Sequence, residues 1–136
     1  MNESIISLTK AAESGDAQAQ YELGVIYALG EEVEQDFTKS REWYLKSAEQ
    51  GDFEASYTVG TMFLDGQGGE INKEKGLKYL EFATTATKYD LGALSASKLL
   101  KDIYKEGYFG IEPSVTKAEK FKQIYIRQNE LFGEEL

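Results

Sequence analysis

The chain has 136 residues, about the size of one compact domain, and its 15 Lys and Arg against 24 Asp and Glu give a net charge of −9. It contains no cysteine and no histidine, which excludes a disulfide framework, a thiolate nucleophile, a zinc–thiolate site and the commonest general base. The acidic balance argues against a nucleic-acid partner, because binding phosphates requires clustered Lys or Arg.

Apolar residues recur with a helical period along the chain, and no useful length alternates with the period of two that is typical of strands. We therefore expect an all-α fold without a sheet. The pattern predicts seven helices, over residues 3–14, 17–29, 37–50, 53–65, 73–87, 92–106 and 115–132. Loops join these helices in pairs, over residues 30–36, 66–72 and 107–114.

The expected helices carry short polar residues at their starts and glycines at their ends. Short polar side chains can accept hydrogen bonds from the unpaired N–H groups of a first helical turn, and the candidates are Asp16, Asp36, Asp52, Asn72, Asp90 and Ser114. Thr116 offers a competing start for the last helix, as part of a capping box. Glycine can adopt the left-handed conformation that ends a helix, and it stands at positions 15, 30, 51, 66 and 107.

The sequence repeats itself with an offset of 36 residues, so that residues 16–24 align with residues 52–60. A looser third copy follows at offsets of 41 and 42, after a longer connection. In that copy Lys101 takes the place of Gly24 and Gly60. Because one helix pair cannot bury its apolar face alone, such copies must stack on one another as a solenoid.

The first strong copy carries a series of small, apolar and polar residues at fixed spacing: Ala19, Leu23, Gly24, Tyr27 and Gly30, then Asp36, Lys39, Ser40, Trp43, Tyr44, Ser47, Ala48, Gly51 and Asp52. These positions resemble a known family, the Sel1-like repeat, which is a relative of the tetratricopeptide repeat. The resemblance covers nearly the whole chain, as a half repeat at 3–16 and repeats at 17–52, 53–89 and 92–132 in one domain over 1–136. It implies a right-handed α/α superhelical solenoid of about three and a half repeats. It also implies a protein-interaction adaptor, and bacterial members occur as immunity proteins that neutralise toxins.

The predicted partner-binding site is the face of each first helix that lies opposite the repeated apolar stripe. By the resemblance, first helices line a concave groove. Tyrosines and aliphatic residues among acids suit a basic partner segment with apolar anchors. The alternative is that these residues pack against neighbouring helices, because periodicity does not separate two buried faces. The predicted binding residues are Tyr21, Glu22, Val25, Leu29, Tyr57, Thr58, Thr61 and Asp65, and the same face holds Gln18, Glu54 and, in the third copy, Ser95, Lys98, Leu99, Asp102 and Glu106.

Three other features are candidates for chemistry. The acidic run over 31–36 either binds a cation or a basic partner, or is a solvated loop in which Asp36 caps a helix. The glycine-rich segment 65–70 lacks the Gly-Lys-Ser/Thr of a phosphate loop and the final glutamate of a calcium loop, so we interpret it as a turn between helices. Trp43 lies on the repeated stripe and is expected to pack in the core.

These observations favour a non-catalytic interaction module that needs no cofactor and no metal. Its groove is expected to hold a protein with a basic surface. In its sharpest form it is an immunity or inhibitor protein that masks a basic toxin, since opposite charges speed association. No secretion signal and no membrane span is visible, so we expect a cytoplasmic protein without a membrane partner.

Two alternatives stay open. Two carboxylates at a suitable distance can support glycoside hydrolysis, so a carboxylate-based hydrolase acting on a small or cell-wall substrate is the second hypothesis, although no carboxylate pair stands out. An end-to-end homodimer is the third, because both ends of a solenoid lack a neighbour. The apolar residues at the ends are Ile5, Ile6 and Leu8, and Phe121, Ile124, Tyr125, Leu131 and Phe132.

Overall fold

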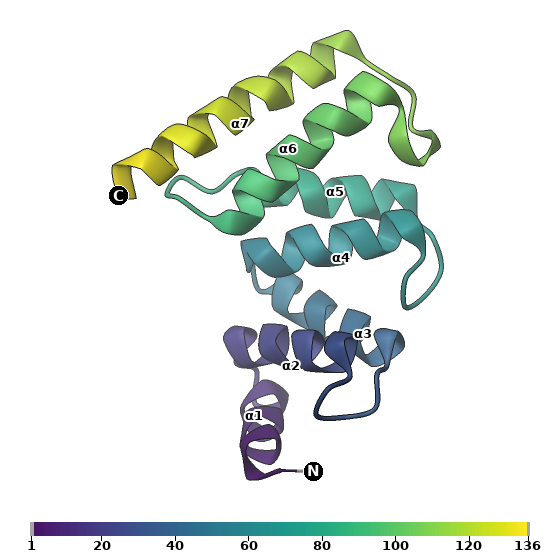
Figure 1. Cartoon of the computed structure of the whole chain (residues 1–136), viewed down its shortest axis with the longest axis vertical. Coiled ribbons are helices and arrows are strands. Elements are labelled where there is room, and N and C mark those ends of the chain that lie inside the picture. The colour runs from purple at the N-terminus through teal and green to yellow at the C-terminus, as the bar shows by residue number, and fades with distance from the viewer. Residues whose placement is uncertain (1, 136) are drawn as a thin grey trace.

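The computed structural model describes residues 2–135 and, within that range, contains helices and no strand. The all-α prediction is therefore confirmed. Figure 1 shows the helices stacked from the N-terminal to the C-terminal end of the chain. They are α1 (Glu3–Glu13), α2 (Ala17–Leu29), α3 (Phe37–Glu49), α4 (Phe53–Asp65), α5 (Lys73–Ala83), α6 (Leu91–Glu106), the 3₁₀ helix η1 (Tyr108–Gly110) and α7 (Val115–Glu135).

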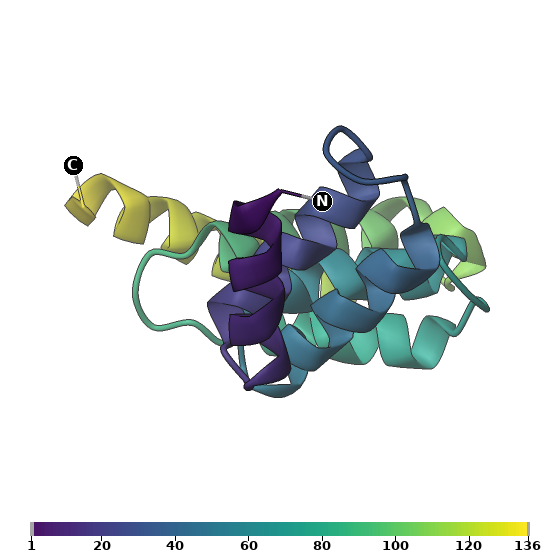
Figure 2. The same cartoon turned by 90° about the horizontal axis from the view of Figure 1, so that it is seen from below.

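The helices form antiparallel pairs, α2 with α3, α4 with α5 and α6 with α7, and the pairs stack on one another (Figure 1). Helix α3 contacts α4, α5 contacts α6, and α6 also packs directly on α4. In the view from below, the C-terminal end of α7 extends beyond the stack (Figure 2). The chain is thus an all-α solenoid, as the repeats predict. No helix within residues 2–135 has the length and apolar character needed to cross a membrane.

The predicted capping residues begin the helices. The side chains of Asp16, Asp36, Asp52, Asn72 and Asp90 each accept a hydrogen bond from a backbone N–H in the first turn that follows. For the last helix the structure selects Ser114 over Thr116, because the Ser114 hydroxyl oxygen accepts from the Lys117 N–H at 3.2 Å. Glycines 30, 66 and 107 end α2, α4 and α6 with left-handed backbone.

One predicted helix end is wrong, and one predicted loop contains a short helix. The helix expected over 73–87 ends at Ala83, because the hydroxyls of Thr84 and Thr85 turn back to the carbonyls of Glu81 and Phe82, each at 2.7 Å. The additional residues of the third repeat therefore form a loop between α5 and α6. The loop expected over 107–114 contains the 3₁₀ helix η1. The other helix boundaries differ from the prediction by at most three residues.

The core consists of three buried clusters that follow one another along the stack. The first is built on Ala12, Ala19 and Leu23, and Trp43 packs against it as predicted. The second joins α3 to α4, and the third joins α4 and α5 to α6 and α7. Phe121 and Leu131 at one end and Ile5 at the other are buried within the chain itself, so these residues are not free to form a homodimer.

Small residues set the spacing between the two helices of the first two repeats. A Cβ atom on Gly24 would lie 2.7 Å from ring carbons of Tyr44, and one on Gly60 would lie 3.0 Å from the carbonyl oxygen of Gly76. Buried Ser40 strengthens the first of these contacts, because its hydroxyl donates to the Gly24 carbonyl at 2.7 Å. A side chain at Gly24 or Gly60 would therefore force the paired helices apart.

We expect Gly24→Ala to lower the free energy of unfolding by about 1–3 kcal/mol, because the new methyl group overpacks a buried ring. Gly133→Ala is the matched control, since a Cβ at that helical position meets nothing within 4 Å. It should leave stability unchanged or raise it by less than about 1 kcal/mol. Urea denaturation followed by circular dichroism measures both. Equal effects of the two variants would contradict the steric argument.

Candidate protein-binding groove

The first helices of the three repeats, α2, α4 and α6, meet at a small hollow of about 120 Å³. We call it the three-helix hollow. Tyr21 comes from α2, and the other lining residues come from α4 and α6: Glu54, Tyr57, Thr58, Leu91, Gly92 and Ser95. The hollow therefore lies along the first helices, where the groove is expected, and all three repeats contribute residues to its lining.

Gly92 allows α6 to reach this position. A Cβ atom on Gly92 would lie 2.5 Å from the backbone carbon and oxygen of Phe53, at the start of α4. Asp90 caps α6 by accepting from the N–H groups of Gly92 and Ala93. The predicted helix begins at residue 92, one residue later than α6, and the predicted groove includes neither Leu91 nor Gly92. The sequence signal for this close approach is Gly92 itself, which stands two positions after the capping residue Asp90.

Both predicted tyrosines are half-buried, with part of each ring in the core and part at the hollow. The Tyr21 ring lies 5.6 Å from the Tyr44 ring, centroid to centroid, and packs against the second core cluster. Tyr57 packs against the third cluster. The two interpretations left open by periodicity therefore each describe part of the geometry: these rings help to hold the repeats together and also line an open surface.

The other five predicted residues do not line the three-helix hollow. Val25 packs against the second core cluster, and Thr61 donates its hydroxyl to the carbonyl of Thr58 at 2.7 Å. Asp65 is exposed, but it accepts the Gln67 N–H at 2.9 Å and so supports the following turn. The remaining two residues lie on the surface: Glu22 is exposed, and Leu29 is 57% exposed.

The hollow is electrostatically negative. Burial raises the pKa of the Tyr21 phenol well above its usual value of about 10, and the neighbouring carboxylate of Glu54 raises it further. Glu54 is the only carboxylate among the residues that line the hollow. The arrangement therefore offers aromatic surface, a phenol that keeps its proton and one acidic group, without the carboxylate pair that glycoside hydrolysis requires.

The acidic run and the glycine-rich segment lie outside the hollow. Asp36 caps α3, and Glu31, Glu32 and Glu34 are exposed in the loop before it. Within residues 2–135, no group of three or more acidic side chains is placed to hold a metal ion. Segment 65–70 is a turn between α4 and α5, as predicted, and the Arg41 guanidinium holds it by donating to the Glu70 carbonyl at 2.9 Å.

Comparison with known proteins identifies the repeats. The family model for the Sel1 repeat matches residues 17–52 and 54–86, which together are more than half of the chain. The chain belongs to the Sel1 repeat family. Sel1 repeats typically form non-enzymatic scaffolds for protein–protein interaction. A search of curated proteins finds no significant match.

Two solved structures resemble this Sel1 repeat protein over most of its length. A Sel1 repeat protein from Oxalobacter formigenes is 28% identical, with a TM-score of 0.78, and the match covers 92% of this chain and 49% of that one. A protective antigen present in uropathogenic Escherichia coli strains, displaying an SLR fold, is 29% identical with a TM-score of 0.77. That match covers 89% of this chain and 25% of the antigen. The chain thus spans about half and a quarter of their lengths.

The raised pKa of Tyr21 predicts a loss of stability at alkaline pH. The folded chain keeps the phenolic proton at pH values where the unfolded phenol, with a pKa of about 10, releases it. This contribution to stability is complete below about pH 10 and is lost as the pH rises further. Tyr21→Phe should therefore show a smaller fall in the urea midpoint between pH 9 and 11 than the wild type.

Absorbance of the phenolate at 295 nm provides the second readout, since the late-titrating component should be smaller in Tyr21→Phe. Tyr108→Phe, which removes an exposed phenol, is the control for the loss of one hydroxyl group. If the wild type and Tyr21→Phe lose stability equally over this pH range, the assignment to Tyr21 is wrong.

Proposed function

We propose that this Sel1 repeat protein is a non-catalytic module that holds a segment of another protein in the groove formed by α2, α4 and α6. The observation that carries the proposal is the three-helix hollow, because half-buried Tyr21 and Tyr57 present aromatic surface there. Tyrosine is frequent among the residues that dominate binding energy at protein interfaces. The groove residues are the eight predicted from the sequence together with Glu54, Leu91 and Ser95.

The charge of the first half of the chain, which contains α2 and α4, supports a partner with a basic surface. Residues 1–68 contain 4 Lys and Arg against 13 Asp and Glu, so they account for the whole net charge of −9. Exposed Glu22 lies one residue after Tyr21, and Glu54 lines the hollow itself. Exposed Leu29 and Leu91 supply apolar surface for anchors on the partner. Opposite charges of this kind accelerate association and select against acidic partners.

In the specific form of the proposal, the chain is an immunity or inhibitor protein that masks a basic toxin in the cytoplasm. A small acidic body that captures a cationic surface quickly suits that role. We further propose that the half repeat at 3–16 and the three repeats act as one domain over 1–136. A toxin-like reading frame beside the gene would favour the immunity role over a general adaptor.

Affinity purification from the native host, with identification of retained proteins, tests the proposal. The wild type should retain a protein with a basic surface whose yield falls as salt is raised. Glu22→Lys combined with Tyr57→Ala should lower the affinity at least tenfold, because the variant reverses a charge and removes an aromatic contact. The same measurement on purified partner, by calorimetry, gives the change in Kd.

Tyr108→Ala is the control, because it removes an exposed tyrosine outside the groove. Circular dichroism distinguishes loss of binding from loss of folding. Since Glu22 is exposed, Glu22→Lys alone provides a second variant whose fold should be unaffected. Undiminished partner binding by the folded groove variants would remove the groove from the proposal, and retention of only acidic partners would remove the basic partner.

A further inference from the structure

A second hollow, with a volume of about 560 Å³, lies between α6 and α7. We call it the C-terminal hollow. Its apolar lining includes Ala118, Val115, Tyr125 and Ile126, and its charged lining consists of Lys101, Lys105, Lys122 and one carboxylate, Glu119. None of its lining residues lines the three-helix hollow. Ile126 is 42% exposed, so this apolar surface is not fully covered by the chain.

The C-terminal hollow occupies the position where the earlier repeats receive the next helix. In the second repeat Leu64 and Leu80 belong to the buried cluster that also contains Leu100 of α6. At the offsets of the third repeat, 41 and 42 residues, their places are taken by Lys105 and Lys122. A helix that docks here would therefore meet two lysines where α6 meets two fully buried leucines.

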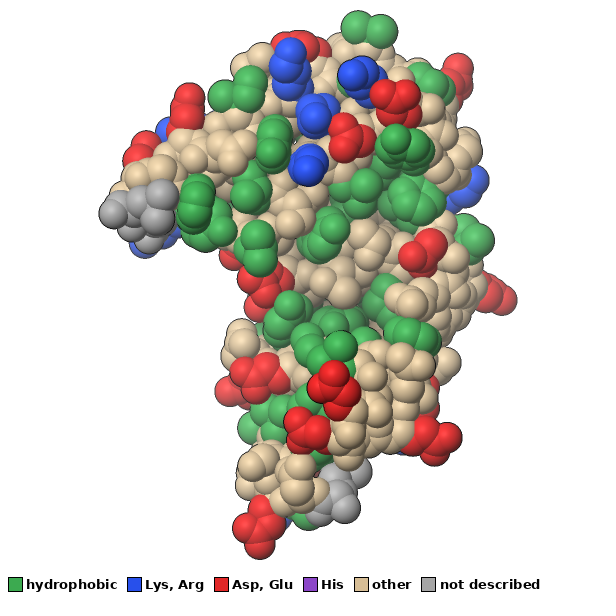
Figure 3. Space-filling view, in the orientation of Figure 1, with side chains coloured by type: hydrophobic (Ala, Val, Ile, Leu, Met, Phe, Trp, Pro, Cys, Tyr) green, Lys and Arg blue, Asp and Glu red, His purple; other side chains and the backbone are tan. Residues whose placement is uncertain are grey.

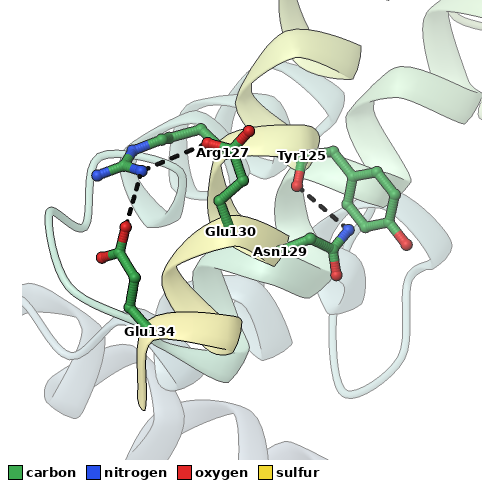
Figure 4. A network of polar contacts seen from close by, with 5 residues as sticks. All are labelled: Tyr125, Arg127, Asn129, Glu130 and Glu134. Atoms are coloured by element: carbon green, nitrogen blue, oxygen red, sulfur yellow. Dashed lines mark hydrogen bonds and ion pairs between the residues drawn. The ribbon is translucent and has the colours of Figure 1, made fainter. Parts of the chain in front are cut away.

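Three lysines line the hollow: Lys101, Lys105 and Lys122. Lys101 Nζ lies 5.5 Å from the centre of the Tyr125 ring, and it pairs with Asp102 at 3.2 Å. Within the described part of the chain, neither Lys105 nor Lys122 forms an ion pair. Arg127, two residues after Tyr125 on α7, differs from these two lysines. Its guanidinium forms ion pairs with Glu130 and Glu134, each at 3.4 Å (Figure 4).

Charge separates the two ends of the molecule. Residues 69–136 contain 11 Lys and Arg and 11 Asp and Glu, in contrast to the acidic first half. In Figure 3 a group of Lys and Arg side chains lies over the part of the surface formed by α6 and α7, and no comparable group is visible over α1 to α3. Because three lysines and one carboxylate, Glu119, line the C-terminal hollow, a ligand there would meet a net positive charge beside apolar surface.

We propose that the C-terminal hollow is the docking site for an acidic amphipathic helix of a partner protein. The helix shape follows from the repeat, since α6 fills the corresponding position on α4 and α5. The acidic flanks follow from Lys105 and Lys122, and the apolar stripe follows from Val115, Tyr125 and Ile126. This proposal concerns a second surface and does not depend on the groove of α2, α4 and α6.

A displayed library of 16-residue helical peptides tests the proposal. Ala, Leu and Tyr are fixed at the spacing of Ala96, Leu100 and Tyr104, and the flanking positions vary among Glu, Lys, Gln and Ser. Selection on the wild-type protein should enrich Glu at the flanks. The Kd of the selected peptide, measured by fluorescence anisotropy, should rise at least tenfold in Lys105→Glu/Lys122→Glu and should rise with added salt.

Lys10→Glu/Lys88→Glu is the matched control, since it makes the same change in net charge at two exposed lysines outside the hollow and should leave the Kd within twofold. Ile126→Ser tests the apolar half of the surface and should weaken binding severalfold. The proposal is overturned if no peptide or only Lys-flanked peptides are enriched, or if the two charge variants bind equally. It is also overturned if sedimentation shows that the hollow is occupied by a second copy of the chain.

Discussion

The distance between the two helices of a repeat is the constraint on which the rest of this structure depends. In the first repeat Gly24 lies against the Tyr44 ring, and in the second Gly60 lies against the backbone of Gly76, so a Cβ atom at either position would require its neighbours to shift. Closely paired helices present one continuous apolar surface to the next repeat. That surface buries Val59 of α4 and Leu100 of α6 completely, and the stacking follows from it.

The third repeat lacks glycine at the two positions where the helices of the second repeat approach each other. Lys101 replaces the glycine of the first helix, and Ala118 stands where the second repeat has Gly76. Lys105 and Lys122 then replace the two leucines that receive a following helix. The two lysines make this face of the third repeat more polar than the corresponding face of the second. They do not cover Tyr125 and Ile126, which is why a hollow remains beside them.

Local rules predicted the fold well because they act within one turn or one repeat. The capping residues and the offset of 36 located the helices, including the choice of Asp90 before α6. The end of α5 escaped prediction, because Thr84 and Thr85 compete for carbonyl groups and that competition leaves no periodic signal. The three-helix hollow was only partly predictable: Tyr21 and Tyr57 share the right face, whereas Leu91 joins them through a tertiary contact that Gly92 permits.

Net charge alone would suggest that this protein binds only basic partners. At physiological ionic strength, however, charges are screened over about 8 Å, so each surface acts mainly through the side chains beside it. Glu22 and Glu54 set the local charge of the groove, and Lys105 and Lys122 set that of the C-terminal hollow. A solenoid in which repeats contact only their neighbours allows such local differences to persist. The two proposed interactions, of a basic segment with the groove and of an acidic helix with the C-terminal hollow, are therefore compatible in one chain of net charge −9.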